Sequence, residues 1–302
     1  MRTSDLFEQV TRQIVTAIED GAGDFIMPWH RWGENLATPL NEASARAYRG
    51  INTLLLWAAA EGAGFSSGRW ATYRQWAAAG AQVRKGEKAT PILFWKTAAN
   101  DDSSGEEGDD ERKRGPRFIA RVYSVFNIDQ VEGAKEGRLG PVLTKAERIS
   151  AAENFIAATG AQVRHGGDRA SYVASIDQIS LPRFEQFRDA ASYYSVLAHE
   201  CVHWTGAKHR LDRDLTGRFG DDAYAMEELV AELGSAFVAA HLKISIEPRR
   251  DHAAYIASWL RVLRGDARAI LTASAKAQQA ADFLIACSAG KAEHPVACCE
   301  RS

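Results

Sequence analysis

The pattern of apolar and polar residues predicts helices at the start of the chain and through most of its second half. Five apolar side chains recur at helical spacing between positions 6 and 18: Leu6, Phe7, Val10, Ile14 and Ile18. That spacing is typical of an amphipathic helix, which we expect to end at the glycines of positions 21 and 23. The same pattern predicts further helices over residues 52–60, 145–159, 190–205, 223–242, 252–264 and 267–286.

Two segments of the first half favour extended structure instead. Residues 89–96 (ATPILFWK) and 117–127 (RFIARVYSVFN) are rich in the β-branched and aromatic side chains that strands prefer. Between them, residues 100–111 contain seven acidic side chains and neither a basic nor an apolar one. Such a run cannot bury enough apolar surface to fold, so we expect a mobile acidic loop within a hairpin. Short strands are also expected at 171–175 and 178–181.

A glycine-rich stretch divides the chain into two parts. Residues 131–143 (VEGAKEGRLGPVL) contain three glycines and one proline, a composition typical of a linker. The sequence therefore predicts an α+β protein of two domains. We expect an N-terminal α/β domain over 1–130 and a mainly helical domain with a small sheet over 144–290. Residues 291–302 are expected to form a tail.

Overall composition excludes several classes of protein. The chain has 302 residues, and 37 basic against 39 acidic side chains give a net charge of −2, which indicates no particular partner. Residues 1–14 lack the unbroken apolar run of a signal peptide, and no apolar stretch reaches the 18 residues of a transmembrane helix. The four cysteines form neither a disulfide framework nor a CxxC pair. We therefore expect a cytoplasmic protein that does not span a membrane.

The first 130 residues become basic once the acidic run is set aside. They hold 16 basic and 17 acidic side chains with the run, and 16 against 10 without it, a net charge of +6. Six of the eight tryptophans also lie here, among basic residues. Interleaved cations and aromatic rings are typical of proteins that bind single-stranded nucleic acid. The candidate contacts are Arg69, Trp70, Tyr73, Arg74, Trp76, Arg84, Lys85, Lys88, Trp95, Lys96, Arg121 and Tyr123.

Burial in a core is the alternative explanation for these tryptophans. For the candidates in the predicted strand 117–127, the alternation of side chains indicates which are exposed, because successive side chains point to opposite faces of a sheet. Arg121 and Tyr123 share a face with Val125, whereas Val122 and Phe126 lie on the other face. The second set is apolar and is expected in the core. We therefore expect Arg121 and Tyr123 on an open face.

A metal-binding motif lies in the predicted helix 190–205. The segment AHECVHW contains the pattern HExxH, with His199, Glu200 and His203 in its fixed positions. Residues four apart share one face of a helix, so His199 and His203 can bind one tetrahedral Zn²⁺. Glu200 lies one step around the helix, where it can act as general base towards a zinc-bound water. The alternative is that both histidines only cap or pack on a helix.

The third protein ligand is expected on the predicted helix 223–242. A catalytic zinc keeps three protein ligands and one open position. Glu228 shares a helical face with the small side chains Ser235 and Ala239, which let this helix approach the HExxH helix closely. Glu232 lies one turn later and can accept a hydrogen bond from a ligand histidine. Glu227 is the reserve candidate for the ligand, and the further alternative is that these acids are ordinary exposed glutamates.

Three residues near the motif have roles that the sequence leaves open. Cys201 projects away from the metal side of its helix and is expected in the core. His209 and Tyr224 can each stabilise an oxyanion, although a purely structural role is the alternative for both.

Eight segments carry motifs of a known family: 25–30 (FIMPWH), 48–55 (YRGINTLL), 82–89 (QVRKGEKA), 91–96 (PILFWK), 125–129 (VFNID), 199–206 (HECVHWTG), 210–215 (RLDRDL) and 227–234 (EELVAELG). They resemble the ArdC-type plasmid antirestriction proteins, over roughly residues 1–245. The resemblance implies an N-terminal domain that binds single-stranded DNA and a zincin-like metallopeptidase domain. It also implies a role in protecting transferred plasmid DNA from host restriction. The acidic run 100–111 departs from the family pattern.

The leading hypothesis is an antirestriction protein with one Zn²⁺ per chain. It binds single-stranded DNA without sequence preference, and a host protein is its candidate substrate. One alternative is a DNA-binding protein whose zinc site is only structural; the presence of Glu200 favours a catalytic site. Another is a free-standing metallopeptidase whose basic half recruits an acidic protein. A monomer is the expected state.

Overall fold

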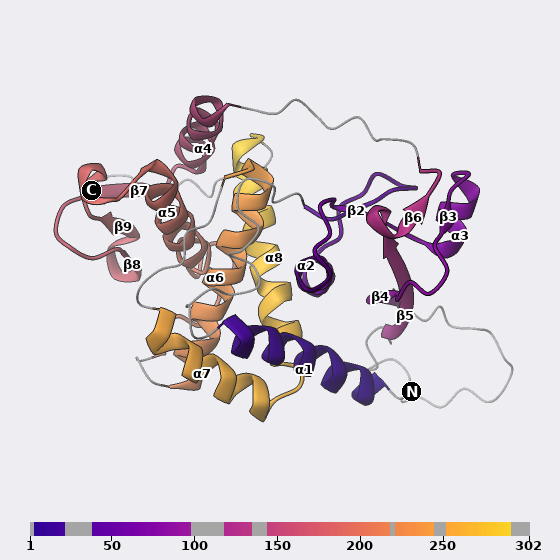
Figure 1. The fold of residues 1–302 in the computed structure, drawn as a ribbon. Helices are drawn as coiled ribbons and strands as arrows, with labels where there is room; N and C mark the ends of the chain where they lie inside the picture. Colours follow the sequence, from indigo (N-terminus) through magenta and orange to yellow (C-terminus); the bar gives the residue numbers. More distant parts are fainter. Residues whose placement is uncertain are drawn as a thin grey trace, which may run out of the picture.

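The computed structural model describes residues 3–21, 38–97, 118–134, 144–217, 221–244 and 252–290. The predicted acidic loop 100–111, the predicted tail 291–302 and most of the predicted linker lie outside these residues. Figure 1 shows helices gathered around α6 and α8, with the small strands of the first half beside them.

The first half is built around a four-stranded sheet with the order β1-β2-β5-β4. Strands β3 and β6 form a separate two-stranded sheet. The strands are β1 (Leu40–Asn41), β2 (Arg69–Thr72), β3 (Gln82–Val83), β4 (Thr90–Thr97), β5 (Phe118–Asn127) and β6 (Val131–Glu132). The helices are α1 (Thr3–Gly21), α2 (Ile51–Ala63) and α3 (Tyr73–Ala78).

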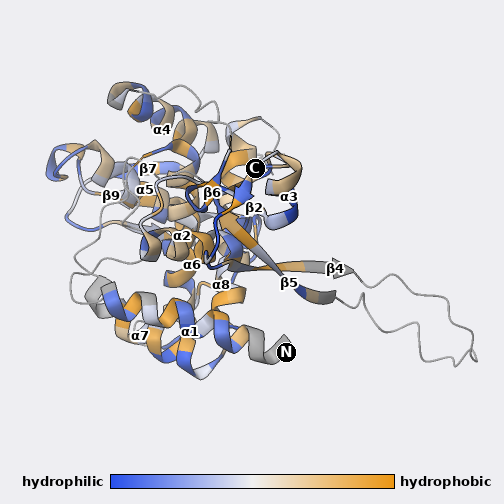
Figure 2. Cartoon of the chain, turned by 45° about the vertical axis from the view of Figure 1, so that its right-hand side comes forward, coloured by the Kyte–Doolittle hydropathy of each residue, from blue (hydrophilic) through white to orange (hydrophobic). Residues whose placement is uncertain are grey.

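The predicted hairpin is confirmed in β4 and β5, which pair antiparallel along the whole of β4. Ile92 lies opposite Tyr123, and Phe94 lies opposite Arg121. Figure 2 shows that the two strands extend beyond the helices at their far end. We call this outer part, residues 94–97 and 118–123, the β4–β5 arm.

Side-chain alternation along β5 does not separate a buried face from an open one. Val125 shares the face of Tyr123 but is 0% exposed, because it packs with Leu56 and Trp70. Val122, expected in the core, is 39% exposed. The reason is position along the strand: the base of the hairpin is covered, whereas the β4–β5 arm projects beyond the body of the protein. The expected core position of Val122 is therefore wrong.

The second half is mainly helical, as predicted. A three-stranded sheet with the order β7-β9-β8 lies beside α5, and α6 packs against α5, α7 and α8. Its elements are α4 (Lys145–Thr159), β7 (Gln162–His165), β8 (Ser171–Val173), β9 (Gln178–Leu181), α5 (Ala190–Thr205), α6 (Asp222–Leu242), α7 (His252–Gly265) and α8 (Ala269–Ser288).

The close approach of α5 and α6 depends on a glycine. A Cβ atom on Gly234 would lie 2.9 Å from both γ-carbons of Val202, which is closer than real side chains come. Ser235 and Ala239, the small residues noted in the sequence, are also buried in α6. The absence of a side chain at position 234 therefore lets the two helices that carry the metal motif lie side by side.

The two halves share one hydrophobic core. A single cluster of buried residues includes members of α1, α2 and every helix of the second half. Hydrogen bonds also join the halves: the Gly50 amide donates to Gln278 Oε1 at 2.9 Å, and Thr11 Oγ1 donates to the Ala267 carbonyl at 2.7 Å. The first two helices therefore pack as part of the helical body.

The predicted linker begins too early. Val131 and Glu132 form β6 and pair with β3, so these two residues belong to the N-terminal part. A two-residue strand leaves no periodic pattern in the sequence, which is why the composition alone suggested a linker there.

No helix among the described residues has both the length and the apolar character needed to cross a membrane.

Candidate metal centre and nucleic-acid surface

Helix α5 places two histidine rings together. Asp189 caps the helix by accepting a hydrogen bond from the Ser192 amide, and regular helical structure then runs through the HExxH motif. His199 is buried and His203 is partly buried. Their Nε2 atoms lie 3.2 Å apart. The spacing of four residues therefore brings two nitrogen donors to one point, as predicted.

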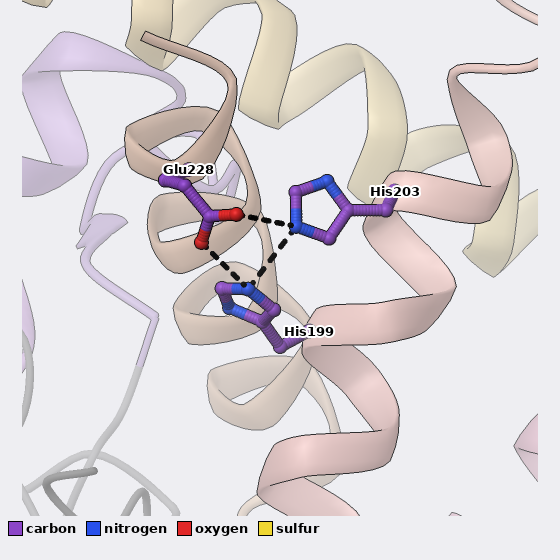
Figure 3. Close-up of side chains that lie close together, drawn as sticks. All are labelled: His199, His203 and Glu228. Carbon is purple, nitrogen blue, oxygen red and sulfur yellow. Dashed lines mark hydrogen bonds and ion pairs between the residues drawn. The ribbon is translucent and has the colours of Figure 1, made fainter. Parts of the chain in front are cut away.

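Glu228 reaches the same point from α6 (Figure 3). Its Oε2 lies 3.4 Å from His199 Nε2, and its Oε1 lies 3.6 Å from His203 Nε2. Ligand atoms of a tetrahedral zinc site, at bond lengths of about 2.0–2.2 Å, are about 3.3–3.6 Å apart. Each carboxylate oxygen of Glu228 thus lies at such a spacing from one histidine nitrogen, and one ligand atom from each of the three residues lies within 4.8 Å of the other two.

A carboxylate lies beside the second nitrogen of each histidine. His199 Nδ1 is 3.5 Å from Glu232 Oε2, and His203 Nδ1 is 3.1 Å from Glu227 Oε1. Partners of this kind hold a histidine ring so that its other nitrogen faces the metal. Glu232, expected to accept a hydrogen bond from a ligand histidine, lies near the His199 ring at ion-pair distance. Glu227, the reserve ligand of the sequence analysis, instead contacts the outer nitrogen of His203.

The two glutamates nearest His203 are negatively charged, which favours the binding of a cation. Burial alone would raise the pKa of Glu228, but the hydrogen bond from His199, the charges of both histidines and a hydrogen bond from Tyr224 lower it to about 2. Burial opposes ionisation of Glu227 as well, and contacts with His203 and Arg213 lower its pKa overall. Both carboxylates are therefore ionised at neutral pH.

Three other residues discussed in the sequence analysis lie in or beside the HExxH helix. Glu200 is buried on α5 beside the histidines. The hydroxyl of Tyr224 hydrogen-bonds Glu228 and lies 3.3 Å from the Tyr255 hydroxyl, so this tyrosine borders the site. Cys201 is fully buried, which confirms its core position, and burial raises the pKa of its thiol.

His209 does not join the metal ligands. Together with Gly206 it completes the pattern HExxHxxGxxH, in which a third histidine binds zinc in one class of peptidases. In this structure its side chain is half exposed and its Nε2 lies 3.4 Å from Asp177. Glu228 from α6, and not His209, lies beside the two histidines of the motif.

Two predicted DNA contacts are wrong as surface residues. Trp70 and Trp76 are each 1% exposed. Trp70 packs with Leu56 and Val125, and the Trp76 indole donates a hydrogen bond to the Phe126 carbonyl at 3.0 Å. Both rings fill small cores of the N-terminal half, so neither can stack on a base in this conformation.

Two predicted cationic contacts are engaged by neighbouring acids. Arg69 binds Glu42 through a two-pronged ion pair, with Nε to Oε2 at 2.7 Å. Arg84 lies 2.8 Å from Glu87. Part of the positive charge counted in the sequence is therefore neutralised locally.

The other described candidates are exposed. Tyr123 is 42% exposed, and Phe94, which the sequence analysis did not select, is 54% exposed on the same face of the β4–β5 arm. Their rings meet edge to face with centroids 5.9 Å apart. For Trp95 and Lys96 the structure describes the backbone in β4 and not the side chain. The exposed group also includes Tyr73, Arg74, Lys85, Lys88 and Arg121.

Comparison with known proteins agrees with both halves of this description. Residues 4–126 match the family described as the N-terminal domain of anti-restriction factor ArdC. Residues 150–276 match the family described as zincin-like metallopeptidase. The protein y4eC of Sinorhizobium fredii (strain NBRC 101917 / NGR234) is 54% identical over 282 residues, which cover 93% of this chain and 92% of that protein.

A DNA primase TraC of Escherichia coli is 39% identical over 294 residues, and the match covers 92% of this chain but only 27% of the primase. The metal-free crystal structure of antirestriction protein ArdC from plasmid R388 matches with a TM-score of 0.76 and 38% identity, covering 96% of this chain and 100% of that one. Its Mn(II)-bound structure matches with a TM-score of 0.74, covering 94% and 98%. The chain therefore belongs to the ArdC family of antirestriction proteins, with an N-terminal ArdC domain followed by a zincin-like domain.

Proposed function

We propose that this chain is an antirestriction protein that binds single-stranded DNA and cleaves a peptide bond at a Zn²⁺ centre. The observation that carries the proposal is the convergence of His199, His203 and Glu228 beside Glu200. A buried site with two nitrogen donors, one carboxylate and an adjacent general base is the donor set of a zinc peptidase.

Each residue of the site has a separate task. His199, His203 and Glu228 would hold the ion, and Glu227 and Glu232 would fix the two rings. When bound, zinc supplies a Lewis acid that polarises the scissile carbonyl and activates water. Glu200 takes up the proton from the attacking water and delivers it to the leaving amine. The Tyr224 hydroxyl, which hydrogen-bonds Glu228, would turn from that carboxylate to donate its one proton to an oxyanion.

Zinc is the proposed metal because of the donor set. Imidazole nitrogens with one carboxylate suit Zn²⁺ at four-coordinate geometry. The ArdC protein of plasmid R388 has a Mn(II)-bound crystal structure, so a related site accepts another divalent ion. Irving–Williams affinities favour zinc over manganese at a nitrogen-rich site.

The β4–β5 arm supports the DNA-binding half of the proposal. Phe94 and Tyr123 expose aromatic rings, and Arg121 extends from the same face. Aromatic faces stack on bases of any sequence, and a nearby guanidinium neutralises phosphate. The arm projects from the body, where a strand of DNA can reach it (Figure 2).

The cellular role proposed here follows from the family and its relatives. An ArdC protein encoded by a plasmid and a TraC primase are both similar to this chain. We infer that the protein accompanies transferred plasmid DNA in the cytoplasm, binds it while single-stranded and protects it from host restriction. A host protein of the restriction system is the proposed peptidase substrate.

A plasmid-transfer assay tests the proposal. Recipients with an active restriction system would receive plasmid DNA in the presence of wild-type protein, Glu200→Gln or Phe94→Ala/Tyr123→Ala. We expect Glu200→Gln to keep its zinc and its DNA binding but to lose protection, because that carboxylate is the general base. The arm variant should keep its zinc and lose DNA binding together with protection. Full protection by Glu200→Gln would contradict the peptidase part and leave DNA binding as the protective activity.

A further inference from the structure

Two buried arginines follow α5, and both bind the end of that helix. Arg210 and Arg213 have side chains only 4% and 5% exposed. Arg210 Nε donates to the Trp204 carbonyl at 2.6 Å, and Arg213 Nη2 donates to the Val202 carbonyl at 2.6 Å. These carbonyls belong to the last turn of α5, where partners within the helix run out. Both arginines therefore cap the metal-binding helix.

The two arginines differ in their acidic partners. Arg210 binds Asp177, which lies away from the metal ligands, at 3.0 Å from Nη1. Arg213 binds Glu227 with two nitrogens, Nε at 3.0 Å from Oε2 and Nη2 at 2.9 Å from Oε1. A planar guanidinium that grips both oxygens of a carboxylate fixes its orientation. Only Arg213 is thus connected to the metal centre.

Glu227, whose orientation Arg213 fixes, contacts His203 of the metal centre. Its Oε1 lies 3.1 Å from His203 Nδ1, on the side of the ring opposite the nitrogen that faces Glu228 and His199. A glutamate has three rotatable bonds, so its carboxylate is a poor guide for a histidine unless something holds it. The two hydrogen bonds from the Arg213 guanidinium hold the Glu227 carboxylate in place.

The backbone around Arg213 is shaped to place its guanidinium. The Arg213 amide donates to the Gly206 carbonyl at 2.9 Å, and its Nη1 donates to Thr205 Oγ1 at 2.8 Å. A Cβ atom on Gly206 would lie 2.9 Å from Arg213 Nη2. The glycine therefore leaves the space that the guanidinium occupies beneath the end of α5.

We propose that Arg213 is a positioning residue of the metal centre, which acts through Glu227 to hold the His203 ring in its metal-binding orientation. The inference rests on the metal centre of the proposed function. Neither arginine touches a metal ligand, so Arg210 provides a matched control: it is equally buried, lies in the same loop and caps the same helix.

The test is zinc affinity, measured by competition with a chelator on the purified full-length protein, with thermal unfolding of the metal-free protein recorded in parallel. Lysine keeps the charge but cannot form the fork. We expect Arg213→Lys to weaken zinc binding about 10–100-fold, the usual effect of losing a partner behind a ligand histidine. Arg210→Lys should lower the unfolding temperature to a similar degree but keep zinc affinity within about threefold of wild type, since it is not connected to a ligand.

A double-mutant cycle separates positioning from general stability. Glu227→Ala alone should weaken zinc binding about 10–100-fold, and adding Arg213→Lys should then cost less than about threefold, because its effect passes through the missing carboxylate. Zinc affinity within about threefold of wild type in Arg213→Lys, or an undiminished effect in the Glu227→Ala background, would overturn the inference. If Arg213→Lys does not fold, the Glu227→Ala variant decides instead: wild-type zinc affinity in that variant would overturn the inference.

His203→Ala distinguishes this inference from the proposed function. Loss of zinc in His203→Ala with wild-type affinity in Arg213→Lys overturns only the role of Arg213. Unchanged zinc binding in His203→Ala overturns the proposed centre itself, and the inference with it.

Discussion

The metal centre and the β4–β5 arm organise their side chains in opposite ways. At the centre, His199, His203 and Glu228 are drawn from two packed helices, and buried acids hold the rings from behind. On the arm, Phe94 and Tyr123 touch each other and are otherwise largely open to solvent. A metal ion requires fixed distances, so its site is preorganised. A strand of changing base sequence requires tolerance, which exposed rings provide.

The same contrast separates the two kinds of aromatic residue in the N-terminal half. Trp70 and Trp76 hold the sheet to its neighbours from inside, whereas Phe94 and Tyr123 lie on its projecting end. Substitution of a buried tryptophan should therefore lower the stability of the fold, whereas substitution of an exposed ring should lower the affinity for DNA.

The largest effect should come from the metal ligands. His199→Ala or His203→Ala should remove essentially all bound zinc, and Glu228→Ala should weaken binding severely, because each leaves two ligands in place of three. Glu200→Ala should retain about one zinc per chain, as its carboxylate is not a ligand. Metal analysis after dialysis measures this. Zinc loss confined to the Glu200 variant would contradict the assignment and break the contrast between centre and arm.

A core tryptophan comes next. Trp76→Ala should lower the free energy of unfolding by about 3–5 kcal/mol, because it empties a buried site and leaves the Phe126 carbonyl without the indole donor. Chemical denaturation of the variant and of wild type gives the difference. The matched control is Tyr123→Phe, which should leave stability nearly unchanged. A Trp76→Ala protein of wild-type stability with weak DNA binding would restore the original surface role of this tryptophan.

The exposed pair should affect binding alone. Phe94→Ala or Tyr123→Ala should cost about 1–3 kcal/mol of affinity for single-stranded oligonucleotides, because each removes one stacking platform. The loss should persist at every salt concentration, since stacking does not depend on released counterions. Fluorescence anisotropy with a labelled oligonucleotide measures it, and denaturation should show unchanged stability. Wild-type affinity in the double variant would mean that the arm does not contact DNA.

The smallest effect concerns the cations. Lys85→Ala should reduce the slope of log K against log salt by about 0.7, the value of one phosphate contact on a single strand. Arg84→Ala should reduce it less, because Glu87 already neutralises that guanidinium at 2.8 Å. Titrations over a series of salt concentrations give both slopes. A larger change for Arg84 than for Lys85 would show that the Glu87 ion pair opens when DNA binds.

Several elements were predictable because their information is local. The helices Lys145–Thr159 and Ala190–Thr205 and the strand Gln178–Leu181 have the predicted bounds. The short strands Gln162–His165 and Gln82–Val83 were missed, since each has a single apolar side chain and pairs with a partner outside its own segment. Glu227 was misjudged for a related reason: a helical wheel gives direction on one helix but not the position of a ring on another.

By itself, the sequence determined the two-histidine half of the metal centre, because four residues of helix fix the distance between His199 and His203. It also determined the family to which the chain belongs, through motifs spread over both halves. Tertiary structure alone decided that Glu228 and not Glu227 lies beside both inner ring nitrogens, that Arg213 reaches Glu227, and that Trp76 is core while Phe94 is surface. Each of those outcomes depends on how separate elements pack, and burial or contact between distant residues is a property of packing that residue type and spacing do not contain.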